Sequence, residues 1–122
     1  MSTIADVKAD SPFLGTWRNT NPKSTGIAEA TFAVREGILV LRVCGGASAN
    51  WFEARAEVFF SDDATAPEKI MVQQDLHPME VLLHGWIKQG VLVLAIFRRF
   101  KGEDRCSNYF DREFFYRANG PR

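Results

Sequence analysis

The chain has 122 residues, the length of one domain, so a two-domain enzyme with a separate cofactor module is excluded. Apolar residues make up 46% of the chain, aromatic residues 12% and charged residues 25%, a composition far from that of disordered, collagenous or coiled-coil proteins. Fifteen basic side chains balance fifteen acidic ones, so the chain lacks the long-range field that draws a protein to nucleic acid or anionic lipid. We therefore expect one core, no nucleic-acid partner and no membrane association.

The N-terminal segment contains no apolar stretch long enough for a secretory signal, which predicts a cytoplasmic location. The longest apolar run, Val91 to Phe97, has only the length of a strand, so no membrane span is predicted. Cys44 and Cys106 lie far apart without C-x-x-C spacing, and we expect both to be reduced. With only two histidines and no carboxylates at a recognisable ligand spacing, we expect neither a metal nor a cofactor.

Glycine and other turn residues recur along the chain, and the segments between them are rich in β-branched and aromatic residues, which predicts an antiparallel meander. Eight strand segments are expected: Phe13–Thr20, Gly26–Arg35, Ile38–Cys44, Trp51–Phe60, Lys69–Leu76, Glu80–Lys88, Val91–Phe100 and Ser107–Arg117. Tight hairpins are predicted at Glu36-Gly37 and Gln89-Gly90, because glycine takes the positive φ that such turns require.

Two of these segments also fit a helical stripe, through Ile27, Ala30, Thr31 and Val34 in one and Phe52, Ala56, Phe59 and Phe60 in the other. We interpret both as strands, because short hairpin-like connections flank them and no capping box opens either. No long helix follows any segment, so folds built on parallel crossovers are not expected.

Antiparallel strands of this number must dispose of their edges, and full closure removes the edges altogether. The sequence therefore predicts an all-β fold, an eight-stranded antiparallel up-and-down barrel over residues 13–118, between a flexible segment 1–12 and a tail 119–122. The interior of such a barrel is just wide enough to be filled by side chains or to hold one small ligand.

The opening strand reads Gly15-Thr16-Trp17-Arg18-Asn19, and its Gly-x-Trp resembles the signature of the calycins, the superfamily of lipocalins, fatty-acid-binding proteins and avidins. The resemblance implies that Trp17 closes the barrel floor, that Gly15 lets the chain bend there, and that an arginine near the last strand packs across the indole. Arg112 and Arg117 are the candidates for that arginine.

Within the superfamily, this stretch is most similar to the first strand of streptavidin and its relatives, where the asparagine two residues after the tryptophan faces the ligand. The likeness implies a ligand-binding role for Asn19. It does not continue into the later strands, where the avidins carry further tryptophan and serine or threonine contacts, and no specific family is identified.

Period-two alternation places Phe13, Gly15, Trp17 and Asn19 on one face, which we expect to point inward. On the last strand we expect the inward face to carry Phe110, Arg112, Phe114 and Tyr116. Arg112 then has two interpretations: a structural partner of Trp17, or a bidentate anchor for a ligand carboxylate or phosphate.

His84 and Trp86 alternate along the sixth segment, where an imidazole beside an indole suits ligand binding or general-base chemistry. Asp75 and His77 share strand parity and form a second candidate acid–base pair. No serine or cysteine stands at a spacing that suggests a nucleophilic triad, so no catalytic residue is assigned.

The segment Val91–Phe100 is apolar on both faces, although a barrel wall should alternate. A monomer rarely leaves a large apolar patch in water, so we expect a second subunit to cover the outer face and form a homodimer, with Trp51 and Phe59 extending the contact.

The leading hypothesis is a binding module whose cup holds a small, mainly apolar or aromatic molecule, with contacts from Asn19, His84, Trp86 and Arg112. Two alternatives stay open. One is an isomerase or lyase that acts on a hydrophobic substrate with His84 or the Asp75/His77 pair as base, and the other is a packed interaction module without a ligand.

Overall fold

The computed structural model describes residues 11–45, 50–60, 68–76, 79–100 and 109–118, and within these ranges the fold is all-β. The strands are β1 (Gly15–Asn19), β2 (Ile27–Arg35), β3 (Ile38–Gly45), β4 (Asn50–Arg55), β5 (Glu57–Phe59), β6 (Lys69–Asp75), β7 (Met79–Lys88), β8 (Val91–Phe100) and β9 (Tyr109–Arg117). The described residues contain no helix with the length and apolar character that a membrane crossing needs.

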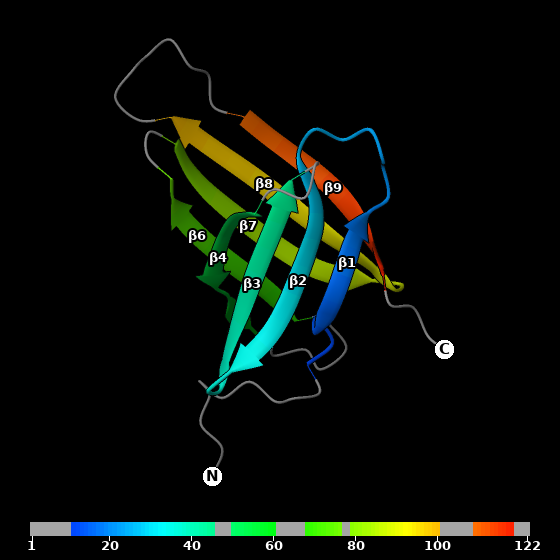
Figure 1. Cartoon of the computed structure of the whole chain (residues 1–122). Coiled ribbons are helices and arrows are strands. Elements are labelled where there is room, and N and C mark those ends of the chain that lie inside the picture. The colour runs from blue at the N-terminus through cyan, green and yellow to red at the C-terminus, as the bar shows by residue number, and fades with distance from the viewer. Residues whose placement is uncertain (1–10, 46–49, 61–67, 77–78, 101–108, 119–122) are drawn as a thin grey trace.

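All nine strands belong to one antiparallel sheet in the order β4-β3-β2-β1-β9-β8-β7-β6-β5. The sheet curls until its two edge strands meet end to end at Ala56, which nearly closes it into a barrel (Figure 1). The predicted barrel is thus confirmed. The strand count is nine rather than eight because the segment predicted as one strand bends at Ala56, where it leaves β3 and begins to pair with β6.

The two segments with a competing helical pattern are both strands. β2 pairs with β3 along its length and with β1 from Glu29 to Phe32, and β4 pairs with β3 from Val40↔Arg55 onward. The apolar side chains at helical spacing do not share one face, since Ala56 is buried inside whereas Phe59 of the same stripe is half exposed. Cross-strand pairing decides the conformation here, and local periodicity does not.

The two tight hairpins form where they were predicted, between β2 and β3 and between β7 and β8. Glu36 and Gly37 have φ angles of 52° and 80°, and Gln89 and Gly90 have 53° and 81°. Positive φ at both central residues defines the type I′ turn, whose twist matches that of the strands it joins. These turns fix the register of the adjoining strands and therefore which side chains point inward.

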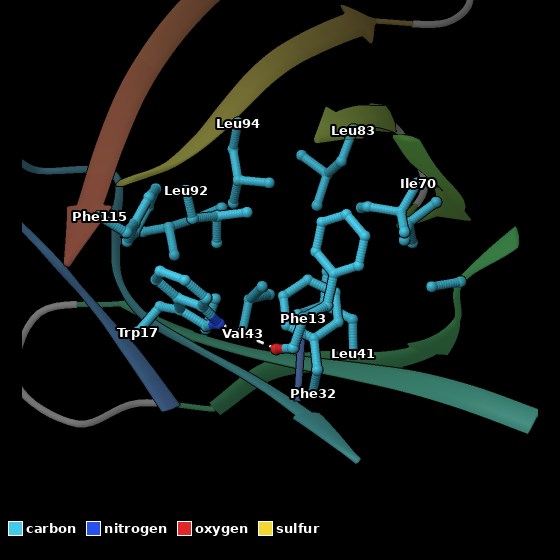
Figure 2. Packing of buried hydrophobic residues seen from close by; sticks show 14 of the residues in the cluster. Phe13, Trp17, Phe32, Leu41, Val43, Ile70, Leu83, Leu92, Leu94 and Phe115 are labelled. Carbon is cyan, nitrogen blue, oxygen red and sulfur yellow. Dashed lines mark hydrogen bonds between the residues drawn. The ribbon is translucent and has the colours of Figure 1, made fainter. Parts of the chain in front are cut away.

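The interior is filled by apolar side chains that alternate along every long strand (Figure 2). The largest fully buried ones are Trp17, Phe13, Phe32, Phe115, Ile27, Leu39, Leu41, Ile70, Leu83, Leu92, Leu94 and Ile96. Phe13 precedes β1 and reaches into this cluster, where its ring lies 5.5 Å from that of Phe32. The body of the barrel is therefore a packed core, and any site for a ligand has to lie at its ends or outside.

Candidate functional site

One end of the barrel is closed by the segment that leads into β1. The indole Nε1 of Trp17 donates a hydrogen bond to the carbonyl oxygen of Phe13 at 2.9 Å, drawn as a dashed line in Figure 2. The guanidinium of Arg117 lies over the same indole, 4.2 Å from the ring centroid, and donates to the carbonyl oxygens of Leu14 at 2.6 Å and Pro12 at 2.9 Å. These contacts tie the incoming chain to both β1 and β9.

The arginine on the indole is Arg117, and the prediction that Arg112 takes this place is wrong. Phe115 is fully buried, so the inward face of β9 carries Glu113, Phe115 and Arg117, while Arg112 is exposed on the outer face. The prediction failed because β9 has aromatic residues on both faces, and composition does not reveal which set is buried. Phe110, Phe114 and Tyr116, which we expected inside, are exposed on the outer face.

The closed end requires a glycine at position 15, because of its backbone conformation and its close approach to Arg117. Its φ of 114° lies in a region that side chains rarely adopt, and a Cβ there would stand 3.1 Å from Nη1 of Arg117. The bend at Gly15 and the burial of Trp17 match what the Gly-x-Trp motif implied for this end of the barrel.

At the opposite end, the described residues form a cleft of about 620 Å³ that opens to solvent, within the usual range of small-molecule sites; this end is called the open end below. The connection between β1 and β2 arches over this end beside β9 (Figure 1). The residues that line the cleft are mostly polar: Asn19, Thr20, Asn21, Lys23, Ser24, Thr25, Gly26, Trp51, Arg98, Asp111, Arg112, Glu113 and Phe114. We take this cleft as the candidate functional site.

At the wall of the cleft, Glu113 receives hydrogen bonds from two neighbouring elements. Ser24 Oγ donates to Glu113 Oε1 at 2.7 Å, and Asn19 Nδ2 donates to the same oxygen while also donating to the carbonyl of Ile27 at 2.8 Å. A Cβ on Gly26 would overlap the Glu113 carboxylate, so glycine at this position lets the acid sit against the backbone. The half-buried carboxylate is thus held in one place by groups that are themselves fixed.

The β1–β2 connection is shaped by short-range hydrogen bonds that hold these donors in place. Asn19 Oδ1 accepts from the backbone N–H of Asn21 at 2.7 Å, and Ser24 Oγ accepts from that of Gly26 at 3.0 Å. Asparagine and serine favour such turns because their side chains bond to backbone groups two residues on. The same side chains that build the turn therefore also present donors to Glu113.

Two further features complete the cleft. Arg98 Nη1 donates to Asp111 Oδ2 at 2.7 Å, with the Arg98 side chain 17% exposed. Trp51 lies where the register between β3 and β4 shifts, and its ring covers Gly45, whose missing Cβ leaves room for it. Irregular pairing of this kind redirects a side chain, here onto the rim of the open end.

Of the predicted ligand contacts, Asn19 lies in the cleft and His84 and Trp86 do not. Val81, Leu83 and Gly85 are the buried residues of β7, so His84 and Trp86 point to the outer face. Arg112 borders the cleft from outside, on the rim. Asp75 is exposed at the end of β6, and its predicted partner His77 lies outside the described residues, as does Cys106.

Sequence reasoning did not single out Ser24, Arg98 or Glu113. A signal exists in hindsight for two of them: Arg98 and Glu113 each lie two residues from a buried apolar position of the same strand, Ile96 and Phe115, whereas Ser24 lies in the β1–β2 connection. Using that signal requires the inward face of β9 to be known, and the sequence leaves that face undecided.

Fold and site together define a small antiparallel barrel with one end sealed and a polar cleft at the other. Comparison with protein-family models, with curated proteins and with solved structures found no match to this chain. Among the described residues, no group of three histidine, cysteine, aspartate or glutamate side chains is arranged to hold a metal ion.

Proposed function

We propose that the protein binds a small molecule in the cleft at the open end of the barrel. The observation that carries the proposal is the half-buried carboxylate of Glu113, fixed by Asn19 and Ser24 in the wall of a cleft of ligand size. A carboxylate that neutral donors hold in place in a concave site can accept hydrogen bonds from a ligand at little cost, because its geometry is set before the ligand arrives.

The lining indicates the chemistry of the ligand. Glu113 favours a group that donates N–H bonds, such as an amidine, a urea or an amide, because Oε1 already accepts from Asn19 and Ser24 and Oε2 keeps its capacity to accept. The ring of Trp51 at the rim favours a planar or aromatic part beside that group. The packed interior leaves no place for a long acyl chain, so the ligand we propose is aromatic and carries a polar head.

The closed end supports the calycin resemblance as part of this proposal. Gly15, Trp17 and Arg117 form the closure that the motif of the opening strand implied, although the arginine is not the one first chosen. In such an architecture a ligand enters from the end opposite the tryptophan, which is where the cleft lies.

The test is a titration with two probes of equal ring size, followed by NMR of the backbone amides. Benzamidine presents two N–H donors and benzoate presents only acceptors, so the proposal expects benzamidine to shift amides around Asn19 and Glu113 and benzoate to shift them far less. Glu113→Gln should abolish the benzamidine shifts, since it removes the charge and one acceptor. Glu29→Gln on the outer face, where Glu29 pairs with Arg18, should retain them.

Each alternative result has a definite meaning. Equal binding of benzamidine by the Glu113→Gln variant, or a preference for benzoate, would exclude Glu113 as the anchor. Benzamidine shifts that cluster on the outer face of β7 and β8 would move the site away from the cleft. A long-chain fatty acid that binds in place of both probes would return the ligand to the interior and overturn the proposed polarity.

A further inference from the structure

The cleft at the open end contains a charged group that the proposed function does not use, the guanidinium of Arg98. Arg98 continues the inward face of β8 beyond Leu94 and Ile96, which are fully buried. Its side chain is only 17% exposed, and its Nη1 donates to Asp111 Oδ2 at 2.7 Å. The stem of this arginine is therefore packed, and its head is held in the lining of the cleft.

Most of the hydrogen-bonding capacity of Arg98 is unused. A guanidinium has five N–H donors, and among the described residues only Asp111 accepts from this one. The other nitrogens of Arg98 are not sealed off, since His84 Nε2 is the one buried side-chain nitrogen or oxygen without a partner in the described part of the chain. A planar fork with free, accessible donors suits a carboxylate, which it binds through two parallel hydrogen bonds.

The charges in the cleft are kept apart. Among the described residues that line it, three are cationic and two are anionic: Lys23, Arg98 and Arg112, and Asp111 and Glu113. No ion pair joins Glu113 to any of these cations, and its carboxylate accepts instead from the neutral groups of Asn19 and Ser24. The lining thus has one positive charge in excess, which attracts an anion.

We propose that the ligand carries a carboxylate as well as its N–H donor head, and that Arg98 binds the carboxylate while Glu113 binds the donors. The inference rests on the proposed function, because it places a second group of the same ligand. Asp111 and Glu113 lie two residues apart on the inward face of β9, about 7 Å along the strand, and Arg98 is bonded to Asp111. An aromatic ring with the two groups at separate positions can bridge such a spacing. The ligand class is therefore an aromatic acid with an N–H donor group.

Lys23 and Arg112 add to the same preference from the rim of the cleft. Both side chains are exposed, and neither forms an ion pair with any residue that the structure describes. Exposed cations contribute a weak attraction that salt screens, whereas the partly buried Arg98 contributes directed hydrogen bonds. Arg98 is therefore the residue that decides whether an acid binds.

The next residue along β8 provides a matched control. Arg99 Nη2 donates to Glu80 Oε1 at 2.6 Å, so Arg99 also has a carboxylate partner. Its side chain is 68% exposed, however, and it is not part of the cleft lining. Arg99→Met therefore removes an arginine and one ion pair without touching the proposed site.

The test compares benzamidine with 3- and 4-amidinobenzoate, which add a carboxylate to the same ring, by NMR titration of the full chain at low salt. At least one of the two isomers should bind about tenfold more tightly than benzamidine, the gain expected from a charge-assisted hydrogen bond. Arg98→Met should reduce this gain to about twofold, since only exposed cations are left. Arg98→Lys should give an intermediate gain because it keeps the charge and loses the fork, and Arg99→Met should retain the full gain.

Benzoate provides a check on the position of the carboxylate. It has no donor for Glu113, so it should bind weakly and shift the amides near Arg98 and Asp111 rather than those near Asn19. The amide spectrum of each free variant shows whether the chain is folded.

The outcomes separate this inference from the proposed function. Benzamidine that binds through Glu113, with neither amidinobenzoate binding more tightly, would overturn the inference and leave the proposed function standing. A gain that Arg98→Met retains, or that Arg99→Met loses to the same extent, would also overturn it. If none of the amidines binds, both proposals fail. Amidinobenzoate binding that Glu113→Gln leaves unchanged, and that Arg98→Met weakens, would support the anion site and overturn Glu113 as the anchor of the donor head.

Discussion

The closed end of the barrel allows a direct test through Arg117. Replacing Arg117 with methionine keeps most of the volume of the side chain and removes its charge and its donors. The variant loses the cation–π contact with Trp17 and the hydrogen bonds to the carbonyls of Leu14 and Pro12. Arg42, an exposed arginine on the outer face of β3, provides the matched control as Arg42→Met.

The magnitude follows from those three contacts. The cation–π contact contributes about 1 kcal/mol. The part-buried hydrogen bond to Leu14 contributes about 1.5 kcal/mol and the exposed one to Pro12 about 0.5 kcal/mol, at the low end for charged donors. The free energy of unfolding should therefore fall by about 3 kcal/mol, which lowers the melting temperature by about 12 °C for a domain of this size.

Urea unfolding followed by far-UV circular dichroism measures the difference, with the same protein concentration for all variants. Arg42→Met should change the free energy of unfolding by no more than about 0.5 kcal/mol, as exposed substitutions without partners do. Equal losses for the two variants would show that the contacts of Arg117 do not stabilise the fold. A third variant, Arg112→Met, should also change the free energy of unfolding little because Arg112 is exposed, and a loss confined to Arg112→Met would show that the inward face of β9 is the other one.

Two glycine positions and the cleft provide the remaining predictions. Gly85→Ala should cost about 1–3 kcal/mol of unfolding free energy because its Cβ would stand 2.8 Å from Leu94 and 2.9 Å from Ile70, whereas Gly90→Ala, in open space at a φ of 81°, should cost about 1 kcal/mol from its backbone alone. Gly90→Asn should recover part of that cost, because the strain at Gly90 comes from its positive φ, whereas Gly85→Asn should not. Urea unfolding of the four variants measures these free energies. Recovery at both sites would contradict the distinction between backbone strain at Gly90 and side-chain overlap at Gly85. Gly26→Ala should displace the Glu113 carboxylate and abolish the benzamidine shifts with the chain still folded, as measured by NMR titration. Unchanged shifts would mean that the carboxylate can move without loss of the site.

Strand positions and hairpins followed from the sequence because their causes are local. The Glu36-Gly37 and Gln89-Gly90 turns lie between alternating segments and fix the adjoining registers on their own. Closure followed from the number of strands. The bend at Ala56, which divides one predicted strand into two, depends on pairing with strands from opposite ends of the sheet, and no local pattern announces it.

The site was harder to predict because it depends on which face of a strand is buried. β7 and β9 carry apolar residues on both faces, so the sequence does not decide between His84 and Leu83, or between Arg112 and Glu113. In each strand the residues chosen from the sequence as ligand contacts, His84 and Trp86 on β7 and Arg112 on β9, proved to lie on the outer face. Asn19 was placed correctly because Trp17, two residues before it, identifies the inner face of β1 without ambiguity.

The division at Ala56 affects where the barrel opens locally. Three residue pairs join β5 to β6, whereas ten join β7 to β8. β1 and β9 also share three pairs, but both lie inside the sheet, so the joint between β5 and β6 is the short one at its edge. Separating β5 from β6 breaks few cross-strand hydrogen bonds and leaves every long hairpin intact, so we expect local opening of the barrel to begin there. Solvent reaching the core would first wet the side of Ile70, at the opposite wall from the sealing tryptophan.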